Sequence, residues 1–579
     1  MTAIVFRVPA MHSRRCLRTI SGRVSDVTGV RTVEIDLHAK TVRVTGPADP
    51  AAVRAAIAAA GYPAADAELE QEMTTMDLLS TATAGLAPAS PVTVTRVHDG
   101  DHVELHITAV NKIVDGIAVR MLAYNGSVPG PVLHVDQDSE ITVLVRNDGD
   151  LPTTVHWHGL RLEHSSDGVP YQTQPPIPIG GAHTYRLRFP DPGIYWYHPH
   201  LREDVAQDMG LYGTIVVEPT DPAYWPPADR WLSLTLDDLL VEEGRPAPYR
   251  RSGPTHTAMG RFGNVMQTNG ETHFAGRATA GEVLRLYLVN TANTRIFNIA
   301  LPGARMKLVG GDSGRYERET LVDEVLLSPS ERAVVDVLFD TPGEVRLEHR
   351  TPHRVYTLGT FTVTAGPNAP AGSFHALRRD PDLTAERATI QADIARPPDK
   401  VLAMVARMSA HSPGHAMAPA AGPHHDAGSH HAHPAGAAHS HESGDGLEWE
   451  DLMPEMNRQS DSTTMAWQLI DRHTGAVNEA IAWSFTVGDR IKLRLVNEIA
   501  SDHPMHHPFH VHGAGRFLIL ARDGRPEPNL VWKDTVLVPT GQTVDMLLDV
   551  SNPGRWMAHC HIAEHNENGM AFSLDVTVR

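Results

Sequence analysis

Apolar and polar residues alternate along most of this chain, in short runs that Gly and Pro residues separate. The run DSEITVLVRN at 138–147 is typical, because its apolar residues recur at every second position, as in a β-strand with one buried face. Similar runs fill most of residues 91–579, where the 3.6-residue periodicity of an amphipathic helix is rare. The pattern therefore predicts a mainly β protein.

Two of these strand patterns occur three times. The first is found at 138–147 and recurs as AGEVLRLYLVN at 280–290 and VGDRIKLRLVN at 487–497. Each copy is followed by a second pattern, in which an alternating strand runs through Pro-Gly into a strand that ends on a histidine: His198, His349 or His559. Repetition of two linked patterns predicts three homologous β-sandwich domains, at about 91–220, 226–366 and 370–579.

Residues 1–65 follow a different pattern and predict a small α+β domain. AIVFRV and VRTVEIDLHAKTVRVTG alternate as strands, whereas SRRCLRTISGRVSD and ADPAAVRAAIAAAGY have the spacing of helices. The resulting order, β-α-β-β-α, is typical of a ferredoxin-like fold. A stretch of small and polar residues at 66–90 is expected to link this domain to the first sandwich.

An insertion at 409–446 interrupts the third predicted sandwich. Ala, Gly, Pro and His dominate it, with Met417 among them, and it lacks the apolar residues that a core needs. We expect a mobile, solvent-exposed loop that can collect copper ions; a solvated low-complexity loop without function is the alternative.

Composition narrows the classes of partner and compartment. The formal net charge of −19 argues against nucleic acid or an anionic membrane as the main partner. No apolar run of about 18 residues occurs, so no membrane span is expected. The N-terminus, MTAIVFRVPAMHSRRC, lacks the long apolar segment of a secretory signal, which favours the cytoplasm. The two cysteines, Cys16 and Cys560, lie at opposite ends, so a disulfide framework is not expected.

Histidine is the residue that points to chemistry. The chain has 35 histidines, and four motifs, HWHG, HPH, HHPFHVHG and HCH, hold pairs two positions apart. Residues i and i+2 of a strand point to the same face, so each pair presents two imidazoles, which suit copper, zinc or iron. The paired residues are His156, His158, His198, His200, His510, His512, His559 and His561.

The placement of these pairs indicates which domains share a site. His198 and His559 occupy the same point in repeats one and three. His349 stands at that point in repeat two but has no histidine two residues later. The first and third sandwiches are therefore expected to share a metal site, with the second as a spacer.

Cys560 faces opposite to its neighbours His559 and His561 on a strand. A thiolate, two imidazoles and a distant thioether match a blue-copper centre, and Cys560, His565, Met570 and His507 can supply them. Eight further imidazoles suit three copper ions. Four one-electron centres match the four electrons that convert dioxygen to two waters.

The four motifs, in this order, resemble those of the multicopper oxidases, the family of laccases, ferroxidases and bacterial cuprous oxidases. The resemblance covers about residues 91–579, and YNGSVPGP, DGVP and GLYG are also similar to the first domain of the family. It implies cupredoxin-like sandwiches and an enzyme that oxidises four substrate equivalents while reducing dioxygen to water.

The resemblance also implies four copper ions, one of type 1, one of type 2 and two of type 3. The type-1 ligands would be His507, Cys560, His565 and Met570. The type-2 ligands would be His156 and His510. One type-3 ion would be bound by His158, His198 and His561, and the other by His200, His512 and His559.

The resemblance also concerns the supply of protons to the site of dioxygen reduction. The family places an acidic residue after HWHG, and Asp167 fits this position; a turn residue in SSDGVP is the alternative. Many bacterial members also carry an acid directly after the last type-1 histidine. This chain has Asn566 there, with Glu564 and Glu567 nearby, so the second acid is left open.

Residues 1–65 resemble a heavy-metal-associated copper-carrier domain. That family binds Cu(I) with Cys-x-x-Cys, but this chain has Ser13 in place of the first cysteine. Cys16, with Met11 or His12, would bind weakly, so we expect the domain to have lost stable carrier function.

The electron donor is expected to arrive near His507 and His565. Asp502, Met505 and Met417 are candidate contacts for Cu(I), with core packing as the alternative for Met505. The leading hypothesis is Cu(I) oxidation in copper tolerance, with phenol oxidation as a second activity. A laccase with an organic donor, and a copper-binding or storage protein with negligible turnover, are the alternatives.

Overall fold

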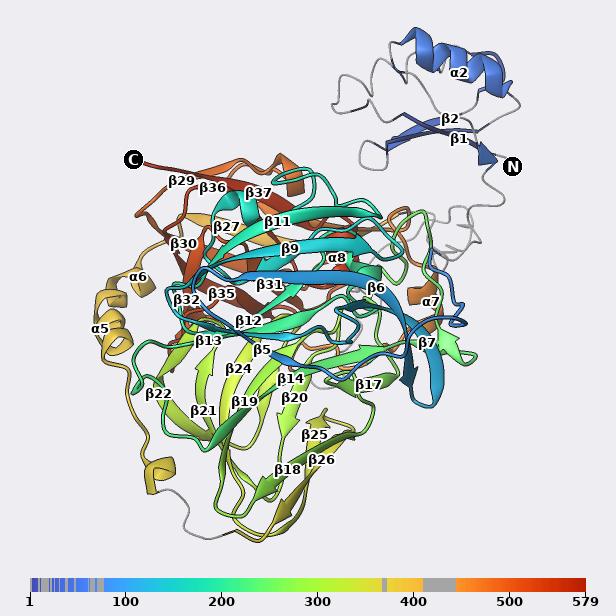
Figure 1. Cartoon of the computed structure of the whole chain (residues 1–579). Helices are drawn as coiled ribbons and strands as arrows, with labels where there is room; N and C mark the ends of the chain where they lie inside the picture. The colour runs from blue at the N-terminus through green and yellow to red at the C-terminus, as the bar shows by residue number, and fades with distance from the viewer. Residues whose placement is uncertain are drawn as a thin grey trace, which may run out of the picture. The chain divides into compact units, whose positions relative to one another are not determined.

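The chain forms two compact units, residues 1–80 with 248–253, and residues 81–247 with 254–579. The computed structural model in Figure 1 describes residues 78–366, 372–409 and 444–579. Within the first 77 residues it describes 3–8, 11, 20, 23–24, 27–30, 32–36, 40–45, 48–60, 62 and 68–69.

The first unit contains an antiparallel sheet and a helix. The sheet has the order β2 (Thr32–Asp36), β3 (Thr41–Thr45), β1 (Ala3–Arg7) and β4 (Glu68–Leu69). Helix α2 (Pro50–Ala59) begins where the Asp49 side chain accepts a hydrogen bond from Ala51 N, and it buries Val53 and Ile57, one turn apart. This order confirms the predicted ferredoxin-like fold. The predicted first helix lies largely, and Cys16 wholly, outside the described residues.

The first sandwich combines a five-stranded and a four-stranded sheet. The five-stranded sheet has the order β10 (His156–His158), β12 (Gly193–His198), β13 (Gly213–Glu218), β8 (Val132–Asp136) and β5 (Val94–Val97). The four-stranded sheet has the order β11 (Gly181–Arg188), β9 (Glu140–Asp148), β6 (His102–Val114) and β7 (Ile117–Tyr124). Because β10 is an edge strand, it places the HWH motif at the border of this domain.

The second sandwich has a six-stranded and a five-stranded sheet. The larger has the order β17 (Val265–Thr268), β14 (Arg230–Leu239), β19 (Val283–Asn290), β24 (Arg332–Leu338), β21 (Arg305–Gly311) and β22 (Gly314–Val322). The smaller has the order β18 (Phe274–Thr279), β26 (Val355–Thr364), β25 (Gly343–Arg350), β20 (Phe297–Ala300) and β23 (Val325–Leu327). A short hairpin, β15 (Val241–Glu242) and β16 (Arg245–Pro246), precedes β17.

The third sandwich repeats this topology strand for strand. Its larger sheet has the order β28 (Met465–Asp471), β27 (Lys400–Met408), β30 (Arg490–Asn497), β35 (Thr543–Val550), β32 (Gly515–Arg522) and β33 (Arg525–Pro526). Its smaller sheet has the order β29 (Trp483–Thr486), β37 (Ala571–Thr577), β36 (Gly554–Cys560), β31 (His507–Val511) and β34 (Thr535–Val538). This correspondence, with the two sheets of the first sandwich, confirms the predicted mainly β fold of three sandwich domains.

Short helices lie in the connections between strands. They are η1 (His164–Ser166), α4 (Glu203–Ala206), η2 (Gly372–His375), α5 (Pro381–Thr389), α6 (Gln391–Ala395), α7 (Pro454–Gln459), η3 (Asn478–Ala480) and α8 (Ala563–Glu567). Two of them, α4 and α8, directly follow histidine motifs. None of the helices in the described part of the chain has the length and apolar character needed to span a bilayer.

The first repeated pattern ends on an asparagine whose side chain makes the same two hydrogen bonds in each sandwich. Asn147 donates to the carbonyls of Leu151 and Ile177, Asn290 to those of Arg295 and Leu327, and Asn497 to those of Met505 and Val538. All three asparagines are buried. A buried amide that satisfies two loop carbonyls fixes the loop that follows the strand, which explains the residue at this position.

Backbone geometry explains the glycine of the Pro-Gly in the second repeated pattern. Gly193, Gly343 and Gly554 each begin the strand that ends near a histidine, and their φ angles are 149°, 143° and 147°. Residues with a Cβ rarely adopt this conformation. The glycine therefore sets the direction in which β12, β25 and β36 leave the turn.

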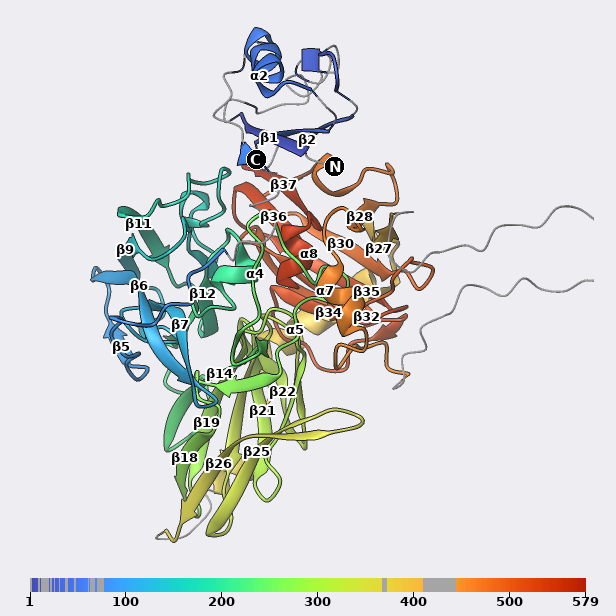
Figure 2. The ribbon, with the colours of Figure 1, turned by 90° about the vertical axis from the view of Figure 1, so that its right-hand side faces the viewer.

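The apolar cores show how the sandwiches are joined. One continuous buried cluster contains residues of the first and third sandwiches, including Trp157 and Trp556, whereas the second sandwich has its own core around Phe361. Figure 2 shows the first sandwich, in blue to cyan, beside the third, in orange to red. The two domains that carry the histidine pairs therefore share an interface.

Asn290→Ala tests the role of the repeated asparagine. The substitution leaves two buried carbonyls without their donor, and we expect it to lower the free energy of unfolding by about 2 to 4 kcal/mol. Urea denaturation measures this change. Asn264→Ala is the matched control, because exposed Asn264 also bonds a carbonyl, that of Val241. Equal effects of the two substitutions would contradict the explanation.

Candidate metal centres

The strand register places the four histidine motifs opposite one another in pairs. In the first sandwich β10 and β12 are neighbours, and His156 pairs with His198. In the third sandwich β31 and β36 are neighbours, and His510 pairs with His559. Since both strand pairs face the interface between these sandwiches, all eight predicted imidazoles meet there.

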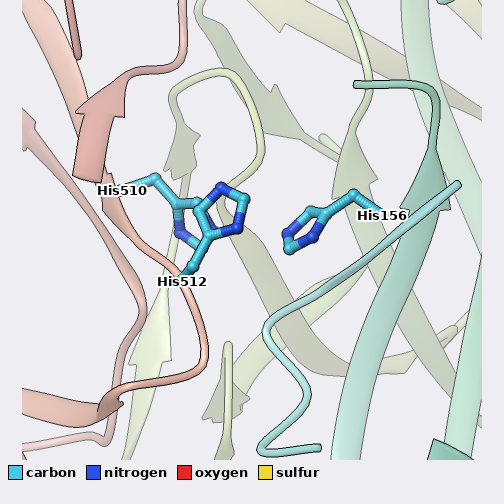
Figure 3. A group of neighbouring side chains, drawn as sticks. All are labelled: His156, His510 and His512. Carbon is cyan, nitrogen blue, oxygen red and sulfur yellow. The ribbon is translucent and has the colours of Figure 1, made fainter. Parts of the chain in front are cut away.

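These eight imidazoles form one buried group, which we call the histidine cluster. The rings of His156 and His512 have centroids 4.0 Å apart, and those of His158 and His510 are stacked at 3.8 Å. Figure 3 shows His510 and His512, from the third sandwich, pointing toward His156 of the first. The most exposed ring, that of His200, is only 5% exposed. The cluster is thus built half from each domain.

Three groups of ring nitrogens in the cluster lie close enough to share a metal ion, with all ligand atoms within 4.8 Å of one another. One of them, His200, His512 and His559, is a predicted type-3 set. The others are His156, His510 and His512, and His156, His158 and His198. His561 lies beside His158 and His198, with ring centroids 5.0 and 5.1 Å away. The structure therefore brings every predicted histidine together.

The ring nitrogens that face the interior suit a metal ion. Within the described residues, Nε2 of His156, His198, His510 and His561, and Nδ1 of His158, are buried without a hydrogen-bond partner. Nε2 of His512 lies 3.2 Å from Nε2 of His200 and 3.1 Å from Nε2 of His559. Buried polar atoms without partners are costly, and a metal bound by imidazole removes this cost. The donor set therefore fits copper.

Burial also keeps most of the cluster uncharged. Desolvation lowers the pKa of His512 to about 3 and of His561 to about 4. It places the pKa of His158, His198, His510 and His559 well below the ordinary value, and neighbouring imidazoles lower it further. Neutral imidazole is the form that binds metal, so these rings do not need to lose a proton first.

The outward-facing nitrogens are held by oxygen atoms. His512 Nδ1 donates to Asp167 Oδ2 at 2.9 Å, and His156 Nδ1 to the Asp167 carbonyl at 2.7 Å. His510 Nδ1 donates to the Asp534 carbonyl at 2.9 Å, and His200 Nδ1 lies 2.9 Å from Glu203 Oε1. Such contacts fix the tautomer and orientation of a metal-binding ring.

Asp167, predicted from its place after HWHG, lies directly against the cluster. Burial opposes ionisation of its carboxyl group, but His512 and His156 outweigh this effect and lower its pKa below the ordinary value. A charged carboxylate is therefore held between two cluster histidines. Its catalytic role stays a prediction.

The sequence left open which acid near the last motif could serve in place of Asn566. The structure shows what Asn566, Glu564 and Glu567 contact. Asn566 donates to Glu203 Oε1 at 3.2 Å, and Glu567 Oε1 accepts from Glu203 N at 3.0 Å. Glu564 accepts from Asn293 at 3.2 Å. Burial and the charge of Asp204 raise the pKa of Glu564 and Glu567 to about 8. Glu203, from α4, thus places a carboxylate beside Asn566, the position at which the resemblance led us to expect an acid.

Sequence reasoning missed two residues that touch the cluster, Glu203 and Asp534. Glu203 follows His200 by three residues, the spacing at which a carboxylate returns to a histidine in a helical turn. Asp534 lies in WKDTV, between two motifs, and Oδ1 of Asp534 is 3.0 Å from His158 Nε2. Only the fold reveals this second contact, because the two residues belong to different domains.

A second group, the sulfur site, lies around Cys560. Its thiol sulfur is 3.4 Å from His507 Nδ1 and 3.8 Å from His565 Nδ1, and all three residues are buried. Met570 is buried in the same apolar core, and its backbone bonds both His565 O and Cys560 N. Burial raises the pKa of the Cys560 thiol, so the thiolate is expected to form together with metal binding.

The two groups are joined through consecutive residues. His559 and His561 belong to the histidine cluster, and Cys560 between them belongs to the sulfur site. His559 Nδ1 also donates to the Cys560 carbonyl at 2.9 Å. One strand end therefore contributes residues to both groups, and their role as ligands stays a prediction from the HCH motif.

Trp467 covers the sulfur site and was not predicted. Its indole stacks on His565 with a centroid distance of 4.0 Å and meets His507 edge-on at 4.9 Å. Trp467 Nε1 donates to the Thr257 carbonyl at 2.6 Å, which holds the ring in place. In the sequence it reads as an ordinary apolar position of a strand.

Of the predicted Cu(I) contacts, the structure describes Met505 and Asp502, which differ in exposure. Met505 is fully buried in the apolar core, which favours the packing alternative and places its side chain away from solvent. Asp502 is half-exposed and bonds Met408 N and pairs with Arg407. Met417 lies outside the described residues. Instead, Nε2 of His503 lies 3.1 Å from Met259 Sδ.

Comparison with known families agrees with this geometry. Residues 95–222 and 452–579 each match a model of the multicopper oxidases, and residues 5–63 match a model of the heavy-metal-associated domain. The two oxidase matches contain all four histidine motifs.

Individual relatives extend the match to most of the chain. Multicopper oxidase MmcO of Mycobacterium tuberculosis is 27% identical over 83% of this chain and 88% of the relative. Copper resistance protein A of Escherichia coli is 24% identical over 80% of this chain and 90% of the relative. A solved multi-copper oxidase from Pseudomonas Thermotolerans has a TM-score of 0.60 at 25% identity, covering 83% of this chain and 100% of that one. The chain therefore belongs to the multicopper oxidases, a family of oxidoreductases, and begins with a heavy-metal-associated domain.

Proposed function

We propose that this enzyme oxidises Cu(I) to Cu(II) in copper tolerance, with laccase-type oxidation of phenols as a second activity. In the balanced reaction four Cu(I) ions lose one electron each. One dioxygen takes up these four electrons and four protons and becomes two waters. Family membership supports the oxygen-dependent half of this reaction, and the surroundings of the sulfur site support the choice of donor.

The resident copper ions would occupy the two groups described above. His507, Cys560 and His565, with Met570, would hold the type-1 ion, and the histidine cluster would hold the other three. Bound copper supplies one-electron redox chemistry, which divides the four-electron reduction of dioxygen into single transfers. The protein contributes buried, oriented ligands and excludes water from both groups.

Burial of the sulfur site supports a small ionic donor. His507 is 1% and His565 0% exposed, so neither imidazole offers an edge to a molecule in solvent. A phenol would have to donate its electron through Trp467. A metal ion, in contrast, can bind to side chains near the indole.

The contact between His503 and Met259 is the observation that carries the proposal. Imidazole and thioether are ligands that suit Cu(I), and here they are 3.1 Å apart. The His503 ring is 6.1 Å from Trp467, which in turn stacks on His565. A Cu(I) ion held by this pair would therefore lie one indole ring away from the sulfur site.

A small cavity adjoins this contact. It has a volume of about 30 Å³, and Met408, Met456 and Met465 line it together with Ala258, the neighbour of Met259. Met408 and Met456 are partly exposed and Met465 is buried, so methionines line the cavity from the surface inward. A path lined by soft sulfur atoms favours Cu(I) over hard cations. The name of the Escherichia coli relative, a copper resistance protein, agrees with this donor.

Met259→Leu tests the donor. Leucine keeps the volume but removes the sulfur, so we expect kcat/KM for Cu(I) to fall about tenfold, or ~1.4 kcal/mol, while phenol oxidation stays unchanged. Oxygen uptake measures both. Met306→Leu, in the core of the second sandwich, is the control and should change neither rate.

Three results would point elsewhere. Equal losses with Cu(I) and phenol would remove the case for Met259 as a Cu(I) contact. Rapid phenol oxidation with negligible Cu(I) oxidation in the unmodified enzyme would indicate a laccase with an organic donor. Copper binding without oxygen uptake from any donor would indicate a storage protein.

Cys560→Ser tests the sulfur site separately. Loss of the thiolate should abolish the intense blue absorption, while the histidine cluster, whose ligands are unchanged, keeps its copper. Absorption spectra and copper analysis measure the two effects. A variant that stays blue would contradict the assignment of Cys560.

A further inference from the structure

Arg332 of the second sandwich is buried beside the histidine cluster, although the cluster histidines come from the other two sandwiches. It is the first residue of β24 and is 1% exposed. A guanidinium group remains charged and carries five donors, so its burial requires several acceptors. The nature of those acceptors shows what Arg332 does.

The main partner of Arg332 is Asp534, and the pair is bidentate. Nη1 donates to Oδ1 and Nη2 to Oδ2, each at 2.6 Å. Asp534 Oδ1 in turn lies 3.0 Å from His158 Nε2. Thr535 Oγ1 also donates to Oδ1, whereas Arg332 supplies the one hydrogen bond to Oδ2 in the described part of the chain. The guanidinium therefore fixes the plane of this carboxylate.

The remaining contacts of Arg332 tie it to the first and second sandwiches. Nε donates to the Ile194 carbonyl of β12 at 3.0 Å, and Nη1 to the Ser330 carbonyl at 3.2 Å. The backbone N–H of Arg332 donates to Asp312 Oδ1 at 2.9 Å. A line of contacts thus runs from the second sandwich, through Asp534 of the third, to His158 of the first.

The glycine of the HWHG motif shows how closely this ion pair fits. A Cβ atom at Gly159 would lie 2.6 Å from Arg332 Nη2 and 2.6 Å from Asp534 Oδ2. Its φ of +86° also disfavours a side chain. The loop after His158 is therefore packed against the ion pair with no room for movement.

We propose that Arg332 is a positioning residue for the copper-binding histidine cluster. By holding Asp534, it keeps a proton on Nε2 of His158, so that Nδ1 presents its lone pair to the cluster. This agrees with the burial of Nδ1, which has no hydrogen-bond partner in the described part of the chain. Carboxylates that orient metal-binding histidines work in this way. The second sandwich is then more than a spacer, because it supplies one element of the metal centre.

Arg285 provides a matched control within the same sheet. It is buried and forms a two-pronged pair with Asp336, at 2.8 and 3.1 Å, between β19 and β24. Among the described contacts, neither Arg285 nor Asp336 touches a cluster histidine. Loss of this pair should disturb stability as loss of the Arg332 pair does, without changing the metal centre.

Copper affinity and electron paramagnetic resonance spectra of the full-length protein test the proposal. We expect Arg332→Met to lower the copper affinity of the histidine cluster about 10- to 100-fold and to disturb the magnetically coupled pair to which His158 would contribute, so that a new paramagnetic copper signal appears. The blue absorption of the Cys560 site should stay unchanged. Arg285→Met should keep full copper loading and the unmodified spectrum. Arg332→Lys should change copper affinity and spectrum in the same direction as Arg332→Met. A single ammonium group cannot donate to both carboxylate oxygens of Asp534 as the guanidinium does.

Several outcomes would overturn the proposal. Wild-type copper affinity and spectrum in Arg332→Met would do so, as would equal copper loss in Arg285→Met. If Arg332→Met does not fold, the same measurements on Arg332→Lys decide, and unaltered copper binding there counts against it. The proposal rests on copper binding by the cluster but not on the donor. An unmodified protein that binds no copper at the cluster would instead refute the cofactor assignment itself.

Discussion

Eight imidazole rings, four from each of two domains, are buried against one another at a domain interface. Burial keeps most of them neutral, and it leaves ring nitrogens facing inward without hydrogen-bond partners among the residues that the structure describes. Such an arrangement is costly for a protein unless a metal ion completes it. The interface between the first and third sandwiches, the tight turn at Gly159 and the oxygen atoms behind most of the rings all serve to hold these nitrogens in place.

Residues of all three sandwiches help to orient the cluster histidines. Asp167 and Glu203 come from the first sandwich, Asp534 from the third, and Arg332 from the second. Each carboxylate accepts from a histidine or faces its ring nitrogen, and each is itself held by another group. The sulfur site depends on the same interface, because the strand end at 559–561 provides ligands to both groups. The packing of the first sandwich against the third therefore positions both the histidine cluster and the sulfur site.

Much of this could be predicted from the sequence, because the relevant signals are local. Strand alternation predicted the β-sandwiches, the repeated Asn and Pro-Gly positions marked equivalent strands, and two-residue histidine spacing identified the imidazoles that meet in the cluster. Contacts between distant segments were not accessible in this way. Asp534 is 376 residues from His158 in the chain, and Arg332 lies between them in a domain that lacks the motif. Trp467 and Met505 both look like core residues, and only the fold shows that one covers a ligand while the other does not.

Copper stoichiometry combined with electron paramagnetic resonance of the fully loaded protein tests the central claim most directly. The account predicts four copper ions per chain, with one blue-copper signal, one type-2 signal and a magnetically coupled, silent pair. One or two ions per chain, or full loading without a coupled pair, would show that the buried imidazoles do not form a three-ion centre, and would contradict the account.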